Sequence, residues 1–197
     1  MIYFLFKYLC TPFFWLLFWP KVKNLSRLFF RGAGIIISNH FSLSDPIRLA
    51  LVIPRPVHFM AKQELFNSKL KRVLLKQMLA FPVYRKQADM LSLKQAMTVL
   101  DRGHIFGIFP EGRRSITGEL DSFEKGAAFL ALRCKVPIIP VYVDPNWKKR
   151  KRMRMIVGEP MNARQIEETY AGRGVDAVTE AIRDQMQLLK NEMELMP

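Results

Sequence analysis

The chain has 197 residues, half of them hydrophobic, which is enough for one domain with a sizeable buried core. It carries 31 Lys and Arg against 17 Asp and Glu, and this net charge of +14 predicts an anionic partner such as membrane phospholipid, nucleic acid or an acidic carrier protein. Its two cysteines, Cys10 and Cys134, lie far apart without the spacing of a disulfide framework or a zinc site, which excludes a disulfide-stabilised scaffold and favours a reducing compartment.

Residues 1–19 form an almost continuous apolar stretch that is interrupted only by Lys7 and Pro12. As a helix the stretch would measure roughly 28 Å, close to the thickness of the hydrocarbon core of a membrane. Because Lys7 lies in its middle and aromatic residues gather at its end, we expect an embedded or re-entrant helical anchor rather than a full span, with a buried core helix as the remaining alternative.

The segment after this stretch contains four basic side chains and no acidic one, which is typical of a flank that lies on anionic lipid at the cytoplasmic surface. We therefore predict a membrane-anchoring segment with a basic flank at residues 1–31 and a protein bound to the cytoplasmic face of the membrane. Because the conspicuous motifs all follow Gly32, removing residues 1–19 is expected to cost membrane binding more than catalysis.

From residue 32 to residue 197 the pattern alternates between strands and helices, which predicts a single α/β domain. Several strand-like runs are continuously apolar, as in a largely parallel or mixed central sheet that helices cover. The predicted strands are 35–39, 57–60, 81–84, 105–109, 138–143 and 153–157. Apolar positions three and four residues apart predict helices at 68–79, 90–101, 122–133 and 175–193.

The stretch SNHFSLSDP, residues 38–46, follows the first predicted strand and has two interpretations. Ser44 or Asp45 could cap a helix with Pro46 at its first position, so that the stretch is a polar turn. Alternatively, His40 is a catalytic base whose imidazole is oriented by Asp45.

Two other predicted strands end in polar groups as well. FPEGRRS, residues 109–115, follows one of them, and FPVYRK ends another with Arg85 and Lys86. Parallel strands deliver the residues after them to one edge of a sheet, so these groups are expected to meet His40 and Asp45 in a site.

The stretches NHFSLSD, FPVYR, FPEGRRS and VPIIPV, in this order, resemble the four sequence blocks of the glycerolipid acyltransferases, and most closely those of bacterial 1-acylglycerol-3-phosphate (lysophosphatidate) acyltransferases. The resemblance covers roughly residues 32–160 and rests mainly on the first and third blocks. Two departures are visible: Arg113 replaces a threonine of the third block, and Tyr84 precedes Arg85 where the second block usually has glycine and aspartate.

The resemblance implies an acyltransferase that moves a fatty acyl group from acyl-CoA or acyl carrier protein to the sn-2 hydroxyl of lysophosphatidate, giving phosphatidate. His40 would be the general base for that hydroxyl and Asp45 would orient it, a mechanism that needs neither a metal nor a cofactor. By the same resemblance Arg85 and Arg114 would bind the acceptor phosphate with their planar guanidinium groups.

The third block supplies two further candidates for the substrate site. Glu111, by resemblance, would bind the glycerol side of the acceptor or support the arginines. Gly112 would let the backbone pass close to the ligand.

Alternative functions remain open at this point. The acceptor could be another lysolipid, or the protein could be a non-enzymatic basic protein that binds membrane or nucleic acid through basic surfaces at 69–76 and 148–154. A nucleic-acid binder needs no apolar N-terminal stretch and no such set of strand ends, so we expect membrane phospholipid and no nucleic acid as the partner.

Overall fold

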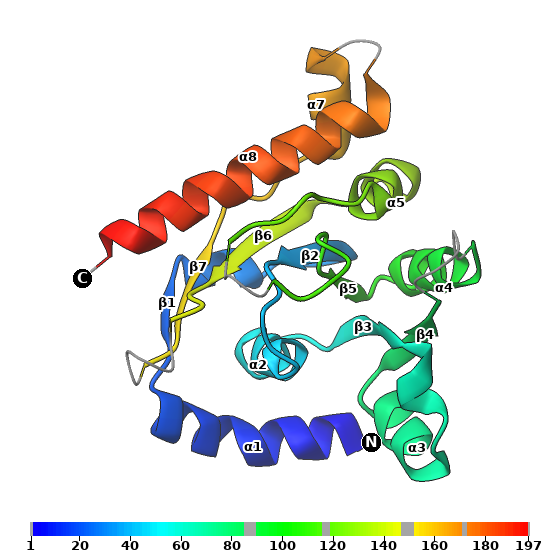
Figure 1. Ribbon diagram of the computed structural model, residues 1–197, viewed down its shortest axis with the longest axis vertical. Coiled ribbons are helices and arrows are strands. Elements are labelled where there is room, and N and C mark those ends of the chain that lie inside the picture. Colours follow the sequence, from blue (N-terminus) through cyan, green and yellow to red (C-terminus); the bar gives the residue numbers. More distant parts are fainter. Residues whose placement is uncertain (1, 85–89, 116–118, 147–151, 171–172, 197) are drawn as a thin grey trace.

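The computed structural model describes residues 2–84, 90–115, 119–146, 152–170 and 173–196. In these residues seven strands form one sheet with the order β1-β7-β6-β2-β5-β3-β4 (Figure 1). The strands are β1 (Lys21–Lys23), β2 (Gly34–Ser38), β3 (Val57–Lys62), β4 (Ala80–Val83), β5 (Ile105–Ile108), β6 (Ile138–Val143) and β7 (Arg154–Val157). β7 pairs antiparallel with β6 and parallel with β1, whereas the other neighbouring pairs are parallel. The sheet is therefore mixed, as predicted.

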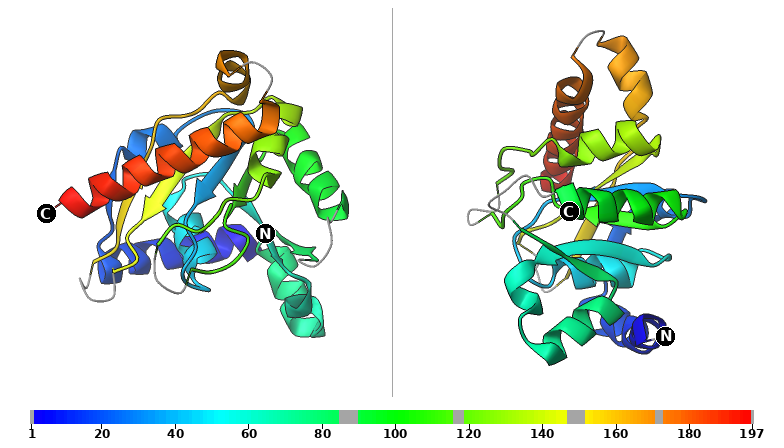
Figure 2. Two further views of the ribbon diagram at one scale, coloured as in Figure 1. Left: turned by 45° about the horizontal axis from the view of Figure 1, so that its top comes forward. Right: turned by 90° about the vertical axis from the view of Figure 1, so that its right-hand side faces the viewer.

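Helices cover both faces of this sheet (Figures 1 and 2). The α-helices are α1 (Ile2–Phe18), α2 (Asp45–Val52), α3 (Lys69–Gln77), α4 (Met90–Asp101), α5 (Gly126–Cys134), α7 (Ala163–Thr169) and α8 (Gly174–Leu195). Short 3-10 helices, η1 (Leu25–Leu28) and η2 (Gln63–Phe66), lie between them.

Strand β2 explains why both faces must be covered, since three consecutive isoleucines make it apolar on either side. Ile36 packs in the core formed with α1 and α2, whereas Ile35 and Ile37 pack in the core formed with α4, α5 and α8. All three side chains are fully buried. This central strand, hydrogen-bonded between β5 and β6, is the rigid support on which the functional site is built.

The N-terminal helix α1 lies along the domain rather than inside it. Its inner face places Tyr3 and Phe14 in the core next to α2, and Lys7 on the same face donates a hydrogen bond to the backbone oxygen of Ile53 at the end of α2. Its outer face is exposed and apolar. The exposed large side chains on it are Phe4, Leu5, Tyr8, Leu9, Phe13, Leu16 and Leu17.

The apolar N-terminal stretch is helical over Ile2–Phe18, as predicted, whereas its predicted role as a membrane anchor is not supported by the structure. Within the part of the chain that the structure describes, no helix combines the length and the hydropathy required to cross a bilayer. Residues 21–23, which the sequence indicated as a basic flank, pair with β7 at the edge of the sheet.

Candidate active site

The turn after β2 is organised by the carboxylate of Asp45, the first residue of α2. Its Oδ2 accepts hydrogen bonds from the backbone N–H groups of Phe41 at 2.9 Å and Ser42 at 2.7 Å. The side chain of Ser44 makes no capping bond to the helix. The turn is therefore closed by the same aspartate that was predicted to orient the catalytic base.

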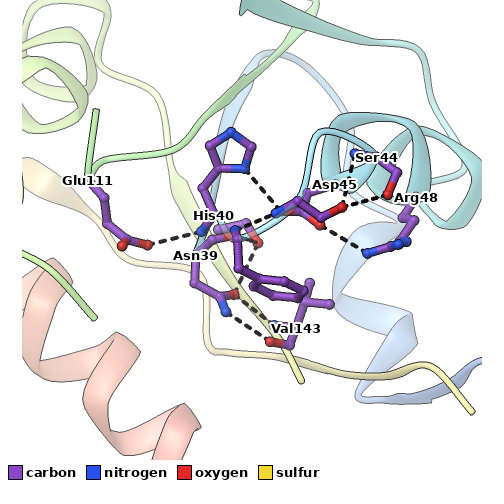
Figure 3. A network of polar contacts seen from close by, with 10 residues as sticks. Asn39, His40, Ser44, Asp45, Arg48, Glu111 and Val143 are labelled. Atoms are coloured by element: carbon purple, nitrogen blue, oxygen red, sulfur yellow. Dashed lines mark hydrogen bonds and ion pairs between the residues drawn. The ribbon is translucent and has the colours of Figure 1, made fainter. Parts of the chain in front are cut away.

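His40 and Asp45 form a buried pair (Figure 3). The Nδ1 atom of His40 lies 3.0 Å from Oδ2 of Asp45, and both residues are buried. Two backbone N–H groups already donate to that oxygen, so the carboxylate serves as an acceptor and Nδ1 must carry the hydrogen that it donates. The lone pair of the neutral imidazole is consequently on Nε2, which the ring directs away from Asp45.

Arg48, one turn along α2, completes the surroundings of the carboxylate. One of its terminal nitrogens lies 3.1 Å from Oδ1 of Asp45, and the arginine is itself buried. Burial lowers the pKa of Arg48, and the charge of Asp45 opposes this shift. Arg48 was not predicted as part of the site, although its position three residues after Asp45 on a helix is a spacing that brings side chains together.

The end of β5 supplies a wall and a support for His40. The ring of Phe109 stacks on the imidazole with centroids 4.2 Å apart. Glu111 is buried, and its Oε1 accepts the backbone N–H of His40 at 3.0 Å, while the backbone N–H of Asp121 donates to Oε2 at 3.4 Å. Because β2 and β5 are parallel neighbours, the first and third sequence blocks meet at one edge of the sheet.

Glu111 supports His40 in the described residues. The contact with the glycerol side of the acceptor, which the resemblance implied, stays a prediction. In the described residues the Glu111 carboxylate holds the backbone of His40 and does not contact an arginine side chain. Burial raises the pKa of Glu111, and the hydrogen bonds from the backbone oppose this shift. The backbone N–H of Ser115 also donates to the carbonyl oxygen of His40 at 2.7 Å. The third block therefore hydrogen-bonds both the N–H and the carbonyl group of His40.

Gly112 has a φ angle of +64°, a backbone conformation that L-residues with a side chain rarely adopt. Its N–H donates to the carbonyl oxygen of Phe109 and closes the turn after β5. The glycine is therefore required by the turn itself, and the predicted close approach of its backbone to a ligand stays a prediction.

The two arginines of the third block differ in their surroundings. Arg113 forms an ion pair with Asp121 at 2.6 Å. Arg114 is exposed and, in the described residues, has no ion-pair partner, which leaves its guanidinium group available for a ligand. Arg85, the other predicted phosphate ligand, lies outside the described residues, as does Lys86.

Asn39, next to His40, was not predicted as part of the site. Its side-chain amide donates to the carbonyl oxygen of Val143 and accepts the N–H of the same residue, each bond measuring 2.9 Å (Figure 3). These two bonds fasten the end of β2 to the end of β6. Sequence spacing gave no signal for them, because the partner lies 104 residues further along the chain.

The site therefore consists of an oriented, buried imidazole with an exposed guanidinium group on the neighbouring loop. No group of three or more His, Cys, Asp or Glu side chains suited to a metal ion exists among the described residues. An imidazole held in this way by a carboxylate has the chemistry that general-base catalysis on a hydroxyl or water requires.

Comparison with known proteins gives the class of the chain. A family model described as Acyltransferase matches residues 20–144. The chain belongs to this acyltransferase family and is an enzyme of the acyltransferase class. This answers the choice that the sequence left open between an enzyme and a non-enzymatic basic binding protein.

Individual members of the family and one solved structure are also similar to this chain. The chain is 32% identical over 180 residues to the 1-acyl-sn-glycerol-3-phosphate acyltransferase of Bacillus subtilis (strain 168), a match that covers 88% of this chain and 89% of that protein. It is 30% identical to the Streptococcus pneumoniae protein of the same name, over 80% of this chain and 61% of that protein. The crystal structure of the 1-acyl-sn-glycerophosphate (LPA) acyltransferase PlsC from Thermotoga maritima has the same fold, with a TM-score of 0.73, 22% identity and coverage of 98% of this chain and 78% of that one.

Proposed function

We propose that the protein transfers a fatty acyl group from an acyl thioester to the sn-2 hydroxyl of 1-acylglycerol-3-phosphate and so makes phosphatidate. The single observation that carries the mechanism is the His40–Asp45 pair, with Nδ1 held at 3.0 Å by a carboxylate and Nε2 directed away from it. The acceptor is inferred from the names of the relatives and from the exposed guanidinium group of Arg114.

In the proposed reaction Nε2 of His40 removes the proton of the sn-2 hydroxyl while the hydroxyl oxygen attacks the thioester carbonyl. The tetrahedral intermediate collapses when its carbon–sulfur bond breaks. The imidazolium, stabilised by the negative charge of Asp45, then returns the proton to the thiolate that leaves. The step needs no covalent enzyme intermediate, no metal and no cofactor.

Substrate binding is assigned to the loops at the same edge of the sheet. Arg114 is proposed to bind the acceptor phosphate, and Arg85 remains a candidate by resemblance. Gly112 closes the turn of the loop that carries Arg114, and Glu111 on the same loop holds the backbone N–H of His40.

The protein is proposed to act at the cytoplasmic face of the membrane, where its lipid acceptor resides. The exposed apolar face of α1 supports this assignment, because such a face on a helix that lies along a domain is suited to the interface of a bilayer. The inner face of α1 packs on α2, the helix that begins with Asp45. Lipid binding and the catalytic pair are thus separated by one helix.

The test is an assay of the purified protein with radiolabelled lysophosphatidate and with acyl-CoA and acyl carrier protein as parallel donors. We expect phosphatidate from at least one donor, and much slower transfer to an uncharged monoacylglycerol. Equal or faster transfer to a different lysolipid would move the assignment to that acceptor, and no transfer with either donor would refute it.

A further inference from the structure

Helix α3 turns its apolar face toward solvent. Leu70, Val73 and Leu74 lie three and four residues apart on one side of the helix and are 79%, 58% and 55% exposed. No residue of α3 is buried. A surface helix of a globular domain normally directs its apolar stripe at the core, so this orientation is the reverse of the usual one.

The opposite side of α3 is what attaches the helix to the domain. Leu75 is half-buried there, and Nε of Arg72 donates to the carbonyl oxygen of Phe66 at 2.9 Å. Phe66 itself is buried in η2. The exposed direction of Leu70, Val73 and Leu74 is therefore fixed by these attachments.

The charges of α3 have one sign. The helix contains Lys69, Lys71, Arg72 and Lys76 and no acidic residue. The acid that precedes it in η2, Glu64, is paired with Lys62 at 3.0 Å. An apolar face bordered by lysines is complementary to a surface that is apolar inside and negatively charged outside, which is the surface of an anionic bilayer.

The position of α3 agrees with such a partner. In Figures 1 and 2 the helix lies on the same side of the molecule as α1, near the N-terminal end of α1, while α8 lies on the opposite side. The other basic surface indicated by the sequence is less suited, because Arg154 is buried and paired with Asp144 and residues 147–151 lie outside the described part.

We propose that α3 is a second lipid-binding element, which inserts Leu70, Val73 and Leu74 into the interface of an anionic bilayer while Lys69 and Lys71 bind headgroup phosphates. The proposal rests on the proposed membrane association and extends it. A single helix in the interface leaves the domain free to rotate about that helix, whereas two contacts fix the orientation of the domain relative to the lipid.

The experiment measures vesicle binding by the full chain, which requires no turnover. Vesicles of phosphatidylcholine are compared with vesicles of equal parts phosphatidylcholine and phosphatidylglycerol. Each basic residue near an anionic surface contributes about fivefold in affinity, so Lys69→Gln with Lys71→Gln should reduce binding to the anionic vesicles roughly 25-fold and binding to phosphatidylcholine little. Leu70→Glu with Val73→Glu should weaken binding to both.

Matched controls on the opposite side of the molecule carry the same chemical changes. They are Arg164→Gln with Arg183→Gln for charge and Leu188→Glu with Leu195→Glu for exposed leucines, and all should bind as wild type does. Circular dichroism and thermal unfolding check that each variant is folded.

The proposal is overturned if the α3 variants bind vesicles as tightly as wild type does. It is also overturned if the matched controls lose as much vesicle binding as the α3 variants do. A change of mass in light scattering without a change in vesicle binding overturns it as well and would assign the face to a second copy of the chain. The two proposals can fail separately. If folded wild type transfers no acyl group, but the α3 variants bind vesicles more weakly than wild type does, this proposal stands and the proposed function is refuted.

Discussion

The carboxylate of Asp45 closes the turn after β2 and orients the imidazole of His40 with the same oxygen atom. Oδ2 accepts from two backbone N–H groups and from Nδ1 of His40, and Oδ1 pairs with Arg48. A carboxylate fixed by four donors cannot rotate away from the imidazole, so the tautomer and direction of His40 are determined before substrate binds. The polar turn and the oriented imidazole, which the sequence offered as alternatives for the SNHFSLSDP stretch, are therefore present together in one structure.

Glu111 is expected to act through the backbone of His40 rather than through the substrate. Glu111→Ala removes the acceptor of the His40 N–H and should lower kcat about 100-fold, as misplacement of a catalytic group by about 1 Å does, with a smaller effect on the KM for lysophosphatidate. Glu111→Gln keeps an acceptor oxygen and should restore most of kcat. Initial rates against acceptor concentration separate the two parameters. A rise in KM with unchanged kcat in both variants would instead place Glu111 on the acceptor.

Arg114 and Arg113 provide a matched pair for phosphate binding. Arg114→Ala should reduce the preference for lysophosphatidate over monoacylglycerol about tenfold or more, since it removes hydrogen bonds between charged groups. Arg114→Lys should fall between alanine and wild type, because an ammonium group keeps the charge and loses the planar fork. Arg113→Ala should change this preference little, because Arg113 is already paired with Asp121. Rates on both acceptors with each variant decide whether phosphate is held by Arg114.

At the scale of elements, helix α1 has two apolar faces with different tasks. Removing residues 1–19 would uncover the core around α2, so the truncation predicted from sequence to spare catalysis is a poor test.

Point substitutions separate the two faces better: Leu9→Glu with Leu16→Glu on the outer face should weaken vesicle binding and leave stability unchanged. Phe14→Ala on the inner face should lower the free energy of unfolding by about 3 kcal/mol. Vesicle sedimentation and urea unfolding measure the two effects, and a loss of both properties in both sets would show that the faces are not separable.

Lys7 gives α1 a pH dependence. Its ammonium group donates to the carbonyl oxygen of Ile53, and burial lowers its pKa from 10.5 to about 8. Between these two pKa values the unfolded chain therefore binds more protons than the folded chain does. Burial of the charged group destabilises the folded state fully below the lower pKa. This destabilisation decreases as pH rises toward the higher pKa. The free energy of unfolding of wild type relative to Lys7→Met should increase across this window. A difference that stays constant with pH would mean that Lys7 is solvated.

The sequence predicted best those helices and strands whose position follows from the apolar pattern of their own residues. The apolar run of β2, the periodic stripe of α8 and the strands at 57–62 and 138–143 were indicated by the sequence within one or two residues. Pairings between distant segments were not, and β1 is the clearest case, since it consists of Lys-Val-Lys and exists because β7 pairs with it.

The helix predicted at 122–133 begins later, at Gly126, because the residues before it belong to the active-site loop. The backbone N–H groups of Asp121 and Glu124 donate to Glu111 and to the carbonyl oxygen of Pro110. A contact of this kind has no local pattern. The same reason explains why His40 and Asp45 were predicted as partners, five residues apart, whereas Asn39 and its partner Val143 were not.

At the scale of the whole molecule, the parallel strands bring the sequence blocks to one edge of the sheet, and α1 and α3 lie together on one side (Figure 2). The net charge of +14 agrees with the proposed association with anionic lipid, where the proposed acceptor is found. The fold thus combines a rigid support for His40 with exposed apolar surfaces on α1 and α3, on which the proposed membrane association rests.

The most direct test of the account compares wild type with His40→Ala in the transfer of a radiolabelled acyl group to lysophosphatidate, with folding and vesicle binding of both proteins measured in parallel. Because general-base catalysis contributes roughly 100-fold to 10,000-fold, we expect the variant to lose kcat in that range or beyond while it remains folded and bound to vesicles. A folded His40→Ala protein that forms phosphatidate at a near-normal rate would contradict it.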